Sequence, residues 1–178
     1  VIPERKTYIV CVGYRKRDWN TLLKAYNESN IDEELYLIGK PDIKCENPKV
    51  KVLPFIPISE LMTYITNAKF SVIPLDDFNY SFAQLTLLQQ MALGVPILAA
   101  DVYAIRDYIR CSNGVIAYTP YDVENLKTKL QGFSKLKEAD LQKMGQSSIE
   151  STKTVLSEQQ MAQRFERICR MLCRGKGI

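Results

Sequence analysis

The sequence predicts a soluble α/β domain with a parallel, doubly wound sheet of about six strands and helices on both faces. Short continuous apolar runs alternate with amphipathic segments along the chain, as they do when helical crossovers join parallel strands. The first two apolar runs each end at a glycine, and no Gly/Ser linker or internal repeat interrupts the alternation. We therefore expect a single domain that spans residues 1–178.

The expected strands are apolar at consecutive positions, which is the pattern of strands covered on both faces. "YIVCV" is followed by Gly13, and "LYLIG" ends at Gly39. The expected strands are 8–12, 35–39, 50–56, 70–75, 96–100 and 114–118.

The expected helices lie between these strands and after the last one. Asp18, Ser59 and Ser81 are candidate N-cap residues, because a short polar side chain there can accept from the first backbone N–H groups. Gly94 and Pro96 close the third helix. The expected helices are 18–29, 59–68, 82–93, about 122–132, 138–150 and 157–173.

Composition excludes several classes of protein. The chain of 178 residues is 46% hydrophobic and 25% charged, which is ordinary for a soluble protein, and no apolar run could span a bilayer. We expect a cytoplasmic location. The net charge of +4 is too small to predict a nucleic-acid partner. The start lacks an initiator methionine and any signal-peptide organisation, which is typical of a domain excised from a longer protein.

Metal and disulfide chemistry are not expected either. The five cysteines lack CxxC spacing and the chain has no histidine, so free thiols are the simplest interpretation. Asp76 and Asp77 are adjacent at a strand end, where their side chains diverge, and we expect no metal site. Without histidine, the most frequent general base is missing, and some catalytic groups would have to lie outside this chain.

In a doubly wound sheet, ligands bind at the carboxyl ends of the strands. The loop after the first strand, "GYRKRDW", carries Arg15, Lys16 and Arg17 just before a helix. Three cations at the positive end of a helix dipole are unfavourable unless an anion relieves them. Arginine side chains and backbone N–H groups at a helix start suit a diphosphate, although a solvated basic loop is the alternative.

The second loop of interest, residues 76–82, opens the expected helix 82–93. We expect its first backbone N–H groups to point into the same crevice as the arginines. An apolar stripe is expected on Leu85, Leu88 and Ala92, with Gln89 off that stripe and Gln90 on the helix surface. The Gln89 carboxamide could hold a hydroxylated ligand by donating and accepting hydrogen bonds at once.

Five stretches follow a known family pattern in order: "CVGYRKRDWNTLLKAY", "LYLIG", "VLPFIPISELMTYITNAKFSVIPL", "SFAQLTLLQQMALGVPILAADVYAIRDYI" and "SNGVIAYTPYDVENL". They resemble the C-terminal domain of group 1 (family 4) glycosyltransferases, which are retaining enzymes of the two-domain GT-B architecture. The resemblance covers about residues 8–130. It is most specific in "LLQQMALGVPIL", which is similar to the family's "LLEAMALGKPVI". It implies a Rossmann-like domain that forms one half of a GT-B enzyme.

The resemblance implies a role for specific residues of the first loop and the helix. Arg15 and Arg17 correspond to the family's arginine and lysine that hold the donor diphosphate. The family also carries two glutamates separated by seven residues, one facing the donor sugar and one binding ribose. They fall at Ser81 and Gln89, so neither carboxylate is present. Some branches of the family have a similar "S-x-GQ-T-x-LL" loop, with glycine at the position of Ala83.

Backbone groups complete the implied donor site. Those of Phe82, Ala83, Thr86 and Leu87 would meet the donor sugar and phosphate. The nucleobase would lie against the loop of residues 55–58, with Ile56 among its contacts. The family fold generally needs no metal, so the expected ligand is a nucleotide diphosphate-sugar as substrate, with no cofactor.

Taken as a whole, the resemblance implies the donor-binding domain of a retaining glycosyltransferase that transfers a sugar to a glycan, lipid or other acceptor. An N-terminal acceptor domain of the same chain would be its partner, and peripheral membrane association would occur through that missing half. This fragment alone would be inactive. The alternative is a non-catalytic nucleotide or sugar-phosphate binding module, which the two missing glutamates favour. The basic helix 157–173 would pack on the missing domain, which leaves its apolar stripe of Met161, Phe165, Ile168 and Leu172 partly exposed.

Overall fold

The computed structural model describes residues 6–13, 15–39, 42–78 and 81–175, with side chains as far as Cys173. The strands are β1 (Tyr8–Val12), β2 (Glu34–Ile38), β3 (Val50–Leu53), β4 (Phe70–Ile73), β5 (Ile97–Ala100) and β6 (Val115–Tyr118). The helices are α1 (Trp19–Ser29), α2 (Ile58–Asn67), α3 (Gln84–Ala92), α4 (Arg106–Ile109), α5 (Val123–Ser134), α6 (Glu138–Thr154) and α7 (Glu158–Gly175).

The strands form one parallel sheet in the order β3-β2-β1-β4-β5-β6, which confirms the predicted fold class. The chain first builds the sheet outward from β1 to β3 and then returns to β4, on the other side of β1. The order therefore reverses between β1 and β4, and this is the switch point at which such sheets bind ligands.

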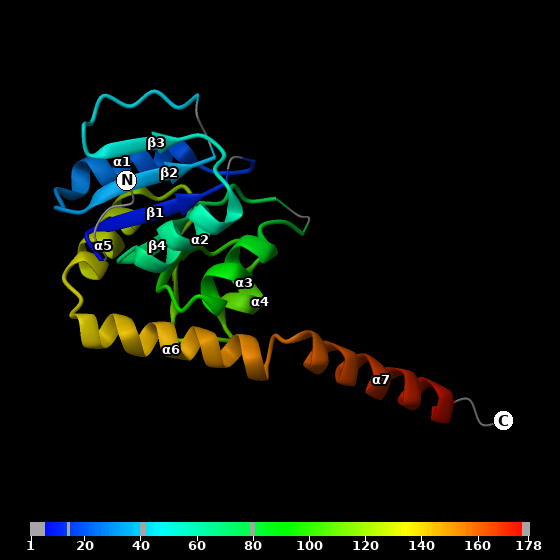
Figure 1. Cartoon of the computed structure of the whole chain (residues 1–178). Helices are drawn as coiled ribbons and strands as arrows, with labels where there is room; N and C mark the ends of the chain where they lie inside the picture. The colour runs from blue at the N-terminus through cyan, green and yellow to red at the C-terminus, as the bar shows by residue number, and fades with distance from the viewer. Residues whose placement is uncertain (1–5, 14, 40–41, 79–80, 176–178) are drawn as a thin grey trace.

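Helices cover both faces of the sheet (Figure 1). Helix α1 connects β1 to β2, and α2 and α3 connect β3 to β4 and β4 to β5, which is the opposite direction across the sheet. Because such crossovers are right-handed, α1 lies on one face of the sheet and α2 and α3 lie on the other. Helix α5 packs against α1, and α6 packs against α3. The pattern predicts α4 nowhere: it is a single short turn in the loop after β5.

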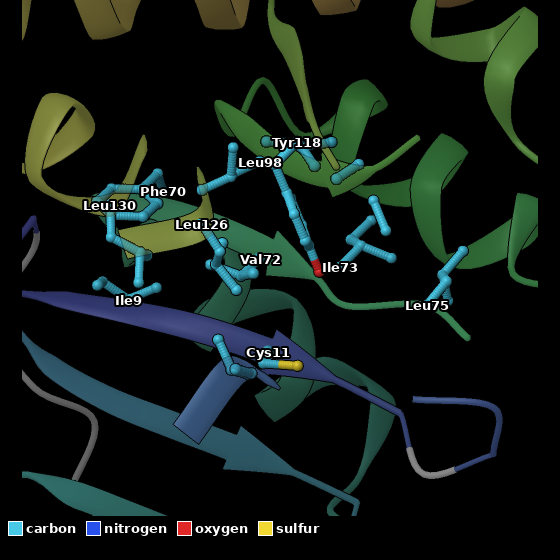
Figure 2. Close-up of a cluster of buried hydrophobic side chains, with 14 of the residues drawn as sticks. Ile9, Cys11, Phe70, Val72, Ile73, Leu75, Leu98, Tyr118, Leu126 and Leu130 are labelled. Atoms are coloured by element: carbon cyan, nitrogen blue, oxygen red, sulfur yellow. The ribbon is translucent and has the colours of Figure 1, made fainter. Parts of the chain in front are cut away.

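The two faces of β1 have separate neighbours. Ile9 and Cys11 point to the α1 and α5 side, and Tyr8 and Val10 point to the α2 side. Figure 2 shows the first side, where side chains of β1, β4 and β5 meet those of α5. Burial raises the pKa of the Cys11 thiol to about 12, so this cysteine is an inert core residue. All five cysteines are free thiols, as expected.

Several element boundaries differ from the expected ones. β3 ends at Leu53 rather than at 56, because Pro54 cannot donate to the sheet. Asp18 caps α1 through its carboxylate, which accepts from the Thr21 N–H at 3.1 Å. Ser59 does not cap its helix: α2 begins at Ile58 and has no side-chain cap.

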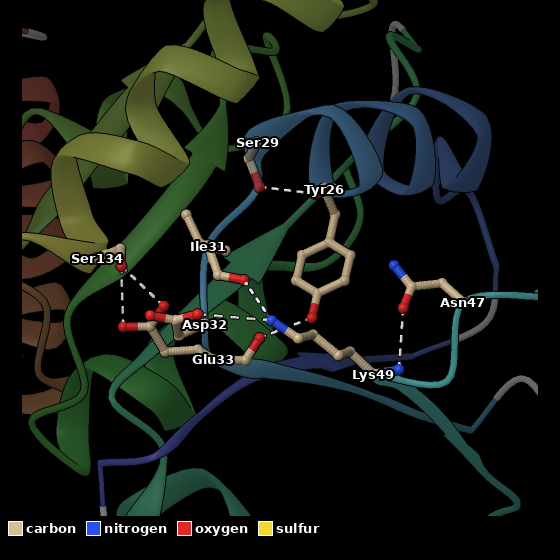
Figure 3. A network of polar contacts seen from close by, with 8 residues as sticks. All are labelled: Tyr26, Ser29, Ile31, Asp32, Glu33, Asn47, Lys49 and Ser134. Atoms are coloured by element: carbon tan, nitrogen blue, oxygen red, sulfur yellow. Dashed lines mark hydrogen bonds and ion pairs between the residues drawn. The ribbon is translucent and has the colours of Figure 1, made fainter.

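A partly buried ion pair lies at the amino ends of the strands, which is the end of the sheet opposite the candidate ligand site. Lys69 Nζ lies 2.5 Å from Glu33 Oε1 and also donates to the Ser134 carbonyl oxygen at 2.7 Å. The Ser134 hydroxyl donates to the Glu33 carboxylate, and the Tyr26 hydroxyl donates to the Glu33 carbonyl oxygen (Figure 3). These bonds join the amino ends of β2 and β4 to the end of α5.

Helix α7 extends away from the body of the protein (Figure 1). From Met161 to Cys173 every side chain is exposed, including the expected apolar stripe of Met161, Phe165, Ile168 and Leu172. In the part of the chain that the structure describes, no helix is both long enough and apolar enough to cross a membrane.

Candidate functional site

The candidate site lies at the carboxyl ends of β1, β3 and β4, beside the switch point. Three loops meet there: residues 13–18 after β1, residues 54–57 after β3 and residues 74–83 after β4. Residues 14, 79 and 80 of these loops lie outside the described part. All three loops were expected to hold the ligand, and the sheet order brings the first and third together.

Backbone contacts clamp the β1–α1 loop to the β4–α3 loop. Arg17 and Leu75 form an isolated antiparallel bridge. The Asp18 N–H donates to the Pro74 carbonyl oxygen at 2.8 Å, and the Asp76 N–H donates to the Lys16 carbonyl oxygen at 3.2 Å. The two loops therefore form one continuous rim at the carboxyl ends of β1 and β4.

Arg17 lies under this rim rather than on it. It is only 9% exposed, and its guanidinium donates from Nε and Nη2 to the Val12 carbonyl oxygen and from Nη1 to that of Arg15. The sequence predicted a diphosphate ligand at this position. In the structure the side chain braces the loop from inside through three of its five N–H groups, and its burial leaves little of the guanidinium accessible to a ligand.

The cations of the rim that solvent reaches best are Arg15 and Lys16. Arg15 is exposed, and the half-buried Lys16 places its Nζ 3.6 Å from the centre of the Phe78 ring, in a cation–π contact between the two loops. Burial and the neighbouring Asp18 raise the pKa of Asp76, although Lys16 and Arg17 oppose this shift. The rim therefore holds carboxylates as well as cations.

Helix α3 begins later than the sequence predicted. Its N-cap is Ala83, which has the left-handed φ of 64° and offers no side-chain cap. Ser81 is therefore not the N-cap; it is exposed, and its hydroxyl accepts from Gln84 Nε2. Gln84 also donates to the Ala104 carbonyl oxygen at 2.9 Å, so it ties the β4–α3 loop to the loop after β5.

The late start changes which backbone N–H groups are available. The Leu87 N–H donates to the Ala83 carbonyl oxygen at 3.0 Å and closes the first turn of the helix. The expected contact of the Leu87 backbone with the ligand stays a prediction, but the Leu87 N–H is already engaged within the helix. The N–H groups without an intrahelical acceptor are those of residues 84–86, the first three of the helix.

The buried face of α3 is also different from the expected one. Leu87, Gln90 and Met91 are buried, whereas Leu85 is 70% exposed and Ala92 is exposed. The predicted stripe of Leu85, Leu88 and Ala92 was therefore wrong, and so was the surface position of Gln90. The Gln90 carboxamide is fully buried, and neither its nitrogen nor its oxygen has a hydrogen-bond partner among the described residues.

Gln89 lies one residue before the buried Gln90 in α3. It shares a helical stripe with Thr86 and Leu93, and Leu93 packs against the same apolar cluster as Ile56 and Leu61. Gln89 and Thr86 are both half-buried. Their stripe therefore leads from the start of α3 towards the β3–α2 loop.

The β3–α2 loop presents apolar side chains to solvent. Phe55 is 68% exposed and Ile58 is 61% exposed, whereas the candidate contact Ile56 is half-buried against the α2 cluster. The Phe82 ring is half-buried and meets Phe78 edge to face, with 6.2 Å between ring centres. Among the described residues, no three His, Cys, Asp or Glu side chains gather as metal ligands would.

Sequence reasoning named Lys16 as a loop cation but did not foresee its contact, and it gave Gln84 no role in joining the loops. Both are polar residues beside a predicted loop, and their contacts depend on how the loops fold against each other. The pattern held no signal for the Lys16–Phe78 contact, which joins residues of two separate loops.

A model of the family described as "Glycosyl transferases group 1" matches residues 6–135. No curated protein sequence matches the chain. Similar solved structures include sucrose-phosphate synthase from Thermosynechococcus elongatus, with a TM-score of 0.72 and 18% identity over 96% of this chain and 46% of that one. WaaG, a glycosyltransferase involved in lipopolysaccharide biosynthesis, has a TM-score of 0.69 and 18% identity over 86% of this chain and 44% of that one.

The catalytic domain of cholesterol-α-glucosyltransferase from Helicobacter pylori has a TM-score of 0.63 and 17% identity over 82% of this chain and 97% of that one. This chain spans less than half the length of the sucrose-phosphate synthase and of WaaG. At these identities the structures show a shared fold. The family match covers most of the chain, including all six strands and the three loops of the crevice, and the chain therefore belongs to the group 1 glycosyl transferases.

Proposed function

We propose that this domain binds the nucleotide diphosphate-sugar donor of a retaining glycosyltransferase. The observation that carries the proposal is the joining of the basic β1–α1 loop to the loop that leads from β4 to α3, at the switch point of the sheet. Cations and uncapped backbone N–H groups then line one crevice, and this combination suits a diphosphate.

The diphosphate would lie between Arg15 and the first turn of α3. Arg15 is exposed on the rim, and its guanidinium can bind a phosphate through two parallel hydrogen bonds. The N–H groups of residues 84–86 point out of the helix start, where the dipole adds positive potential. The backbone of Phe82 and Ala83 would meet the donor sugar beside them. Arg17 contributes its charge and the shape of the loop.

The nucleoside would extend along the stripe of Thr86 and Gln89 towards the β3–α2 loop. Gln89 keeps an acceptor oxygen for a ribose hydroxyl, although a neutral acceptor makes a bond roughly half as strong as a carboxylate does. The base would lie against Ile56, beside the exposed ring of Phe55. Backbone groups of this loop would read the base.

The chemical step is the weak part of the donor site. A carboxylate near the departing nucleotide would stabilise an oxocarbenium-like transition state, and Ser81 has none to offer. Its hydroxyl is already engaged by Gln84. We infer that the acceptor and the missing catalytic groups come from an N-terminal domain of a longer chain, and that this chain alone transfers no sugar. Neither a metal nor a cofactor has a role in this proposal.

One observation favours a second candidate, a non-catalytic module that binds a nucleotide or a sugar phosphate. Both positions that the family resemblance assigns to glutamates lack a carboxylate, while the phosphate side of the crevice keeps its cations. Release of the nucleotide from UDP-, GDP- or ADP-glucose by the longer chain would rule this candidate out.

Calorimetry with UDP, GDP and ADP tests donor binding directly. We expect at least one nucleotide to bind in a salt-sensitive manner, since the phosphate contacts are exposed to screening. Arg15→Gln should weaken it by about 10-fold, the value of one charge-assisted bond of about 1.5 kcal/mol. Arg110→Gln is the matched control, because its exposed guanidinium lies at the C-cap of α4 and pairs with Asp107. Equal affinity in the two variants would contradict the phosphate site.

Two further variants distinguish a residue that stabilises the loop from a residue that contacts the nucleotide. Arg17→Gln should lower both the affinity and the free energy of unfolding, because the Val12 and Arg15 carbonyl oxygens lose their partners. Gln89→Glu should tighten nucleotide binding a few-fold by restoring a charged acceptor for the ribose. Weaker binding by Gln89→Glu would show that Gln89 does not face the ribose.

A further inference from the structure

A second cavity, of about 550 Å³, lies outside the donor crevice. Its walls come from the loops that follow β4, β5 and β6 and from the first turns of α5. The cavity shares the β4–α3 loop with the candidate site through Asp77, but Arg15, Gln89 and Ile56 are not among its lining residues. Its size is that of a pocket for a small organic ligand.

The charges of this cavity are balanced. Asp77 and Asp101 supply two carboxylates, and Arg106 and Lys129 supply two cations. Arg106 Nε donates to Asp101 Oδ1 at 2.7 Å, and its Nη2 donates to the Asp101 carbonyl oxygen at 3.0 Å. A multiply charged anion would meet two carboxylates here, and a metal ion would meet two cations. The balance therefore favours a neutral ligand.

The cavity also offers hydrogen-bonding capacity that the protein does not use. In the described part of the chain, the second Asp101 oxygen, the side-chain amide nitrogen of Asn125 and the ammonium of half-buried Lys129 have no hydrogen-bond partner. The Asn125 oxygen is occupied, because it accepts from the Thr119 N–H at 3.0 Å. Donors and acceptors side by side suit hydroxyl groups, each of which donates once and accepts twice.

Tyr121 forms one wall of the cavity, and its backbone is strained. Its φ is 61°, which is unfavourable for a bulky side chain, and the residue remains 55% exposed. Its hydroxyl accepts from the Asp77 N–H at 2.7 Å, so the strained turn after β6 is fastened to the loop after β4. Strain of this kind is found at ligand sites more than elsewhere. The ring supplies an apolar surface beside the polar groups.

We propose that this cavity binds a pyranose unit of a neutral glycan. The hydroxyls of the sugar would bond to Asp101, Asn125 and Lys129, and one face of the ring would lie on Tyr121. The site is separate from the nucleotide crevice, and binding here does not require that the donor site be occupied. Asp77 joins the two sites, since it belongs to the same loop that leads to α3.

Saturation-transfer NMR and calorimetry with maltotriose, chitotriose and mannotriose test this site. At least one trisaccharide should bind, and Asp101→Asn and Lys129→Met should each weaken it by fivefold or more. Lys143→Met, on the exposed face of α6, is the matched control and should leave the affinity unchanged. The absence of binding by all three sugars, or equal binding by the two variants and the control, would overturn the proposal.

Competition distinguishes this proposal from the donor proposal. The trisaccharide should bind equally well when the domain is saturated with the nucleotide that binds best. Displacement by the nucleotide would mean that the sugar occupies the donor crevice, and the proposal would fall. Binding of inorganic phosphate or Ca²⁺ that Lys129→Met or Asp101→Asn abolishes, without sugar binding, would also overturn it. Sugar binding without nucleotide binding would instead contradict the proposed function.

Discussion

The guanidinium of Arg17 lies directly against Gly13, so close that a β-carbon on Gly13 would stand 2.6 Å from Arg17 Nη2. The bonds from this guanidinium to the Val12 carbonyl oxygen hold the end of β1 and the loop after it. Gly13 also has a φ of 112°, which side chains rarely adopt. The course of the β1–α1 loop therefore depends on a glycine at this position.

Gly13→Ala should destabilise the domain by about 2 kcal/mol or more, because it adds backbone strain and displaces Arg17. Urea unfolding measures the loss. Gly132→Ala is the matched control: Gly132 lies in α5, no atom is within 4 Å of an added β-carbon, and the helix should gain about 0.5–1 kcal/mol. Similar effects of the two substitutions would contradict the role of Gly13.

Gln90→Met should stabilise the domain, by about 1–2 kcal/mol, because it removes two buried polar atoms that have no partner in the described residues. The side chain is fully buried and similar in length to methionine. Gln89→Met, one residue earlier and half-buried, should change the free energy of unfolding by less than about 0.5 kcal/mol. A loss of stability in Gln90→Met would show that the carboxamide is bonded.

The fold was predictable because the apolar pattern of the strands and their alternation with helices both indicate a doubly wound parallel sheet. Buried parallel strands are apolar at every position, and the alternation with helices fixes a doubly wound sheet. The same rule predicts where the candidate site lies, since ligands of doubly wound sheets bind at the carboxyl ends of the strands. The contact between the β1–α1 and β4–α3 loops then depends only on β1 and β4 being neighbours.

The inward course of Arg17 and the register of α3 were not predictable. An arginine beside two other cations looks like a ligand for phosphate, and only the path of the loop places its guanidinium near the Val12 carbonyl oxygen. In α3, leucine and alanine at helical spacing favoured one face, whereas a polar residue, Gln90, lies on the face that is actually buried. The polarity of a residue such as Gln90 does not indicate that it is buried.

Ala83→Gly should increase the free energy of unfolding slightly, by up to about 1 kcal/mol, because the left-handed φ of 64° strains alanine and not glycine. The gain is small because the unfolded chain with glycine has more freedom to lose. Ala92→Gly, at an exposed helical position of α3, provides the contrast and should cost about 0.5–1 kcal/mol. Thermal or urea unfolding of both variants checks the difference, and a loss in both would contradict the assigned backbone strain.

Glu33→Gln should make the stability of the domain less dependent on pH in mildly acidic solution. Burial raises the pKa of Glu33, but hydrogen bonds from Lys69 and Ser134 outweigh it and hold the pKa below its usual range. The unfolded chain therefore takes up the proton more readily than the folded one. The stabilisation from Glu33 is complete above the unfolded pKa and is lost as the pH falls through it towards the folded pKa.

Urea unfolding from pH 7 to pH 3 should show a steeper loss of unfolding free energy in the unmodified chain than in Glu33→Gln. Glu124→Gln, in an exposed pair with Lys127, should leave the native slope nearly unchanged. Parallel curves for the native chain and Glu33→Gln would contradict this role of the Glu33–Lys69 pair.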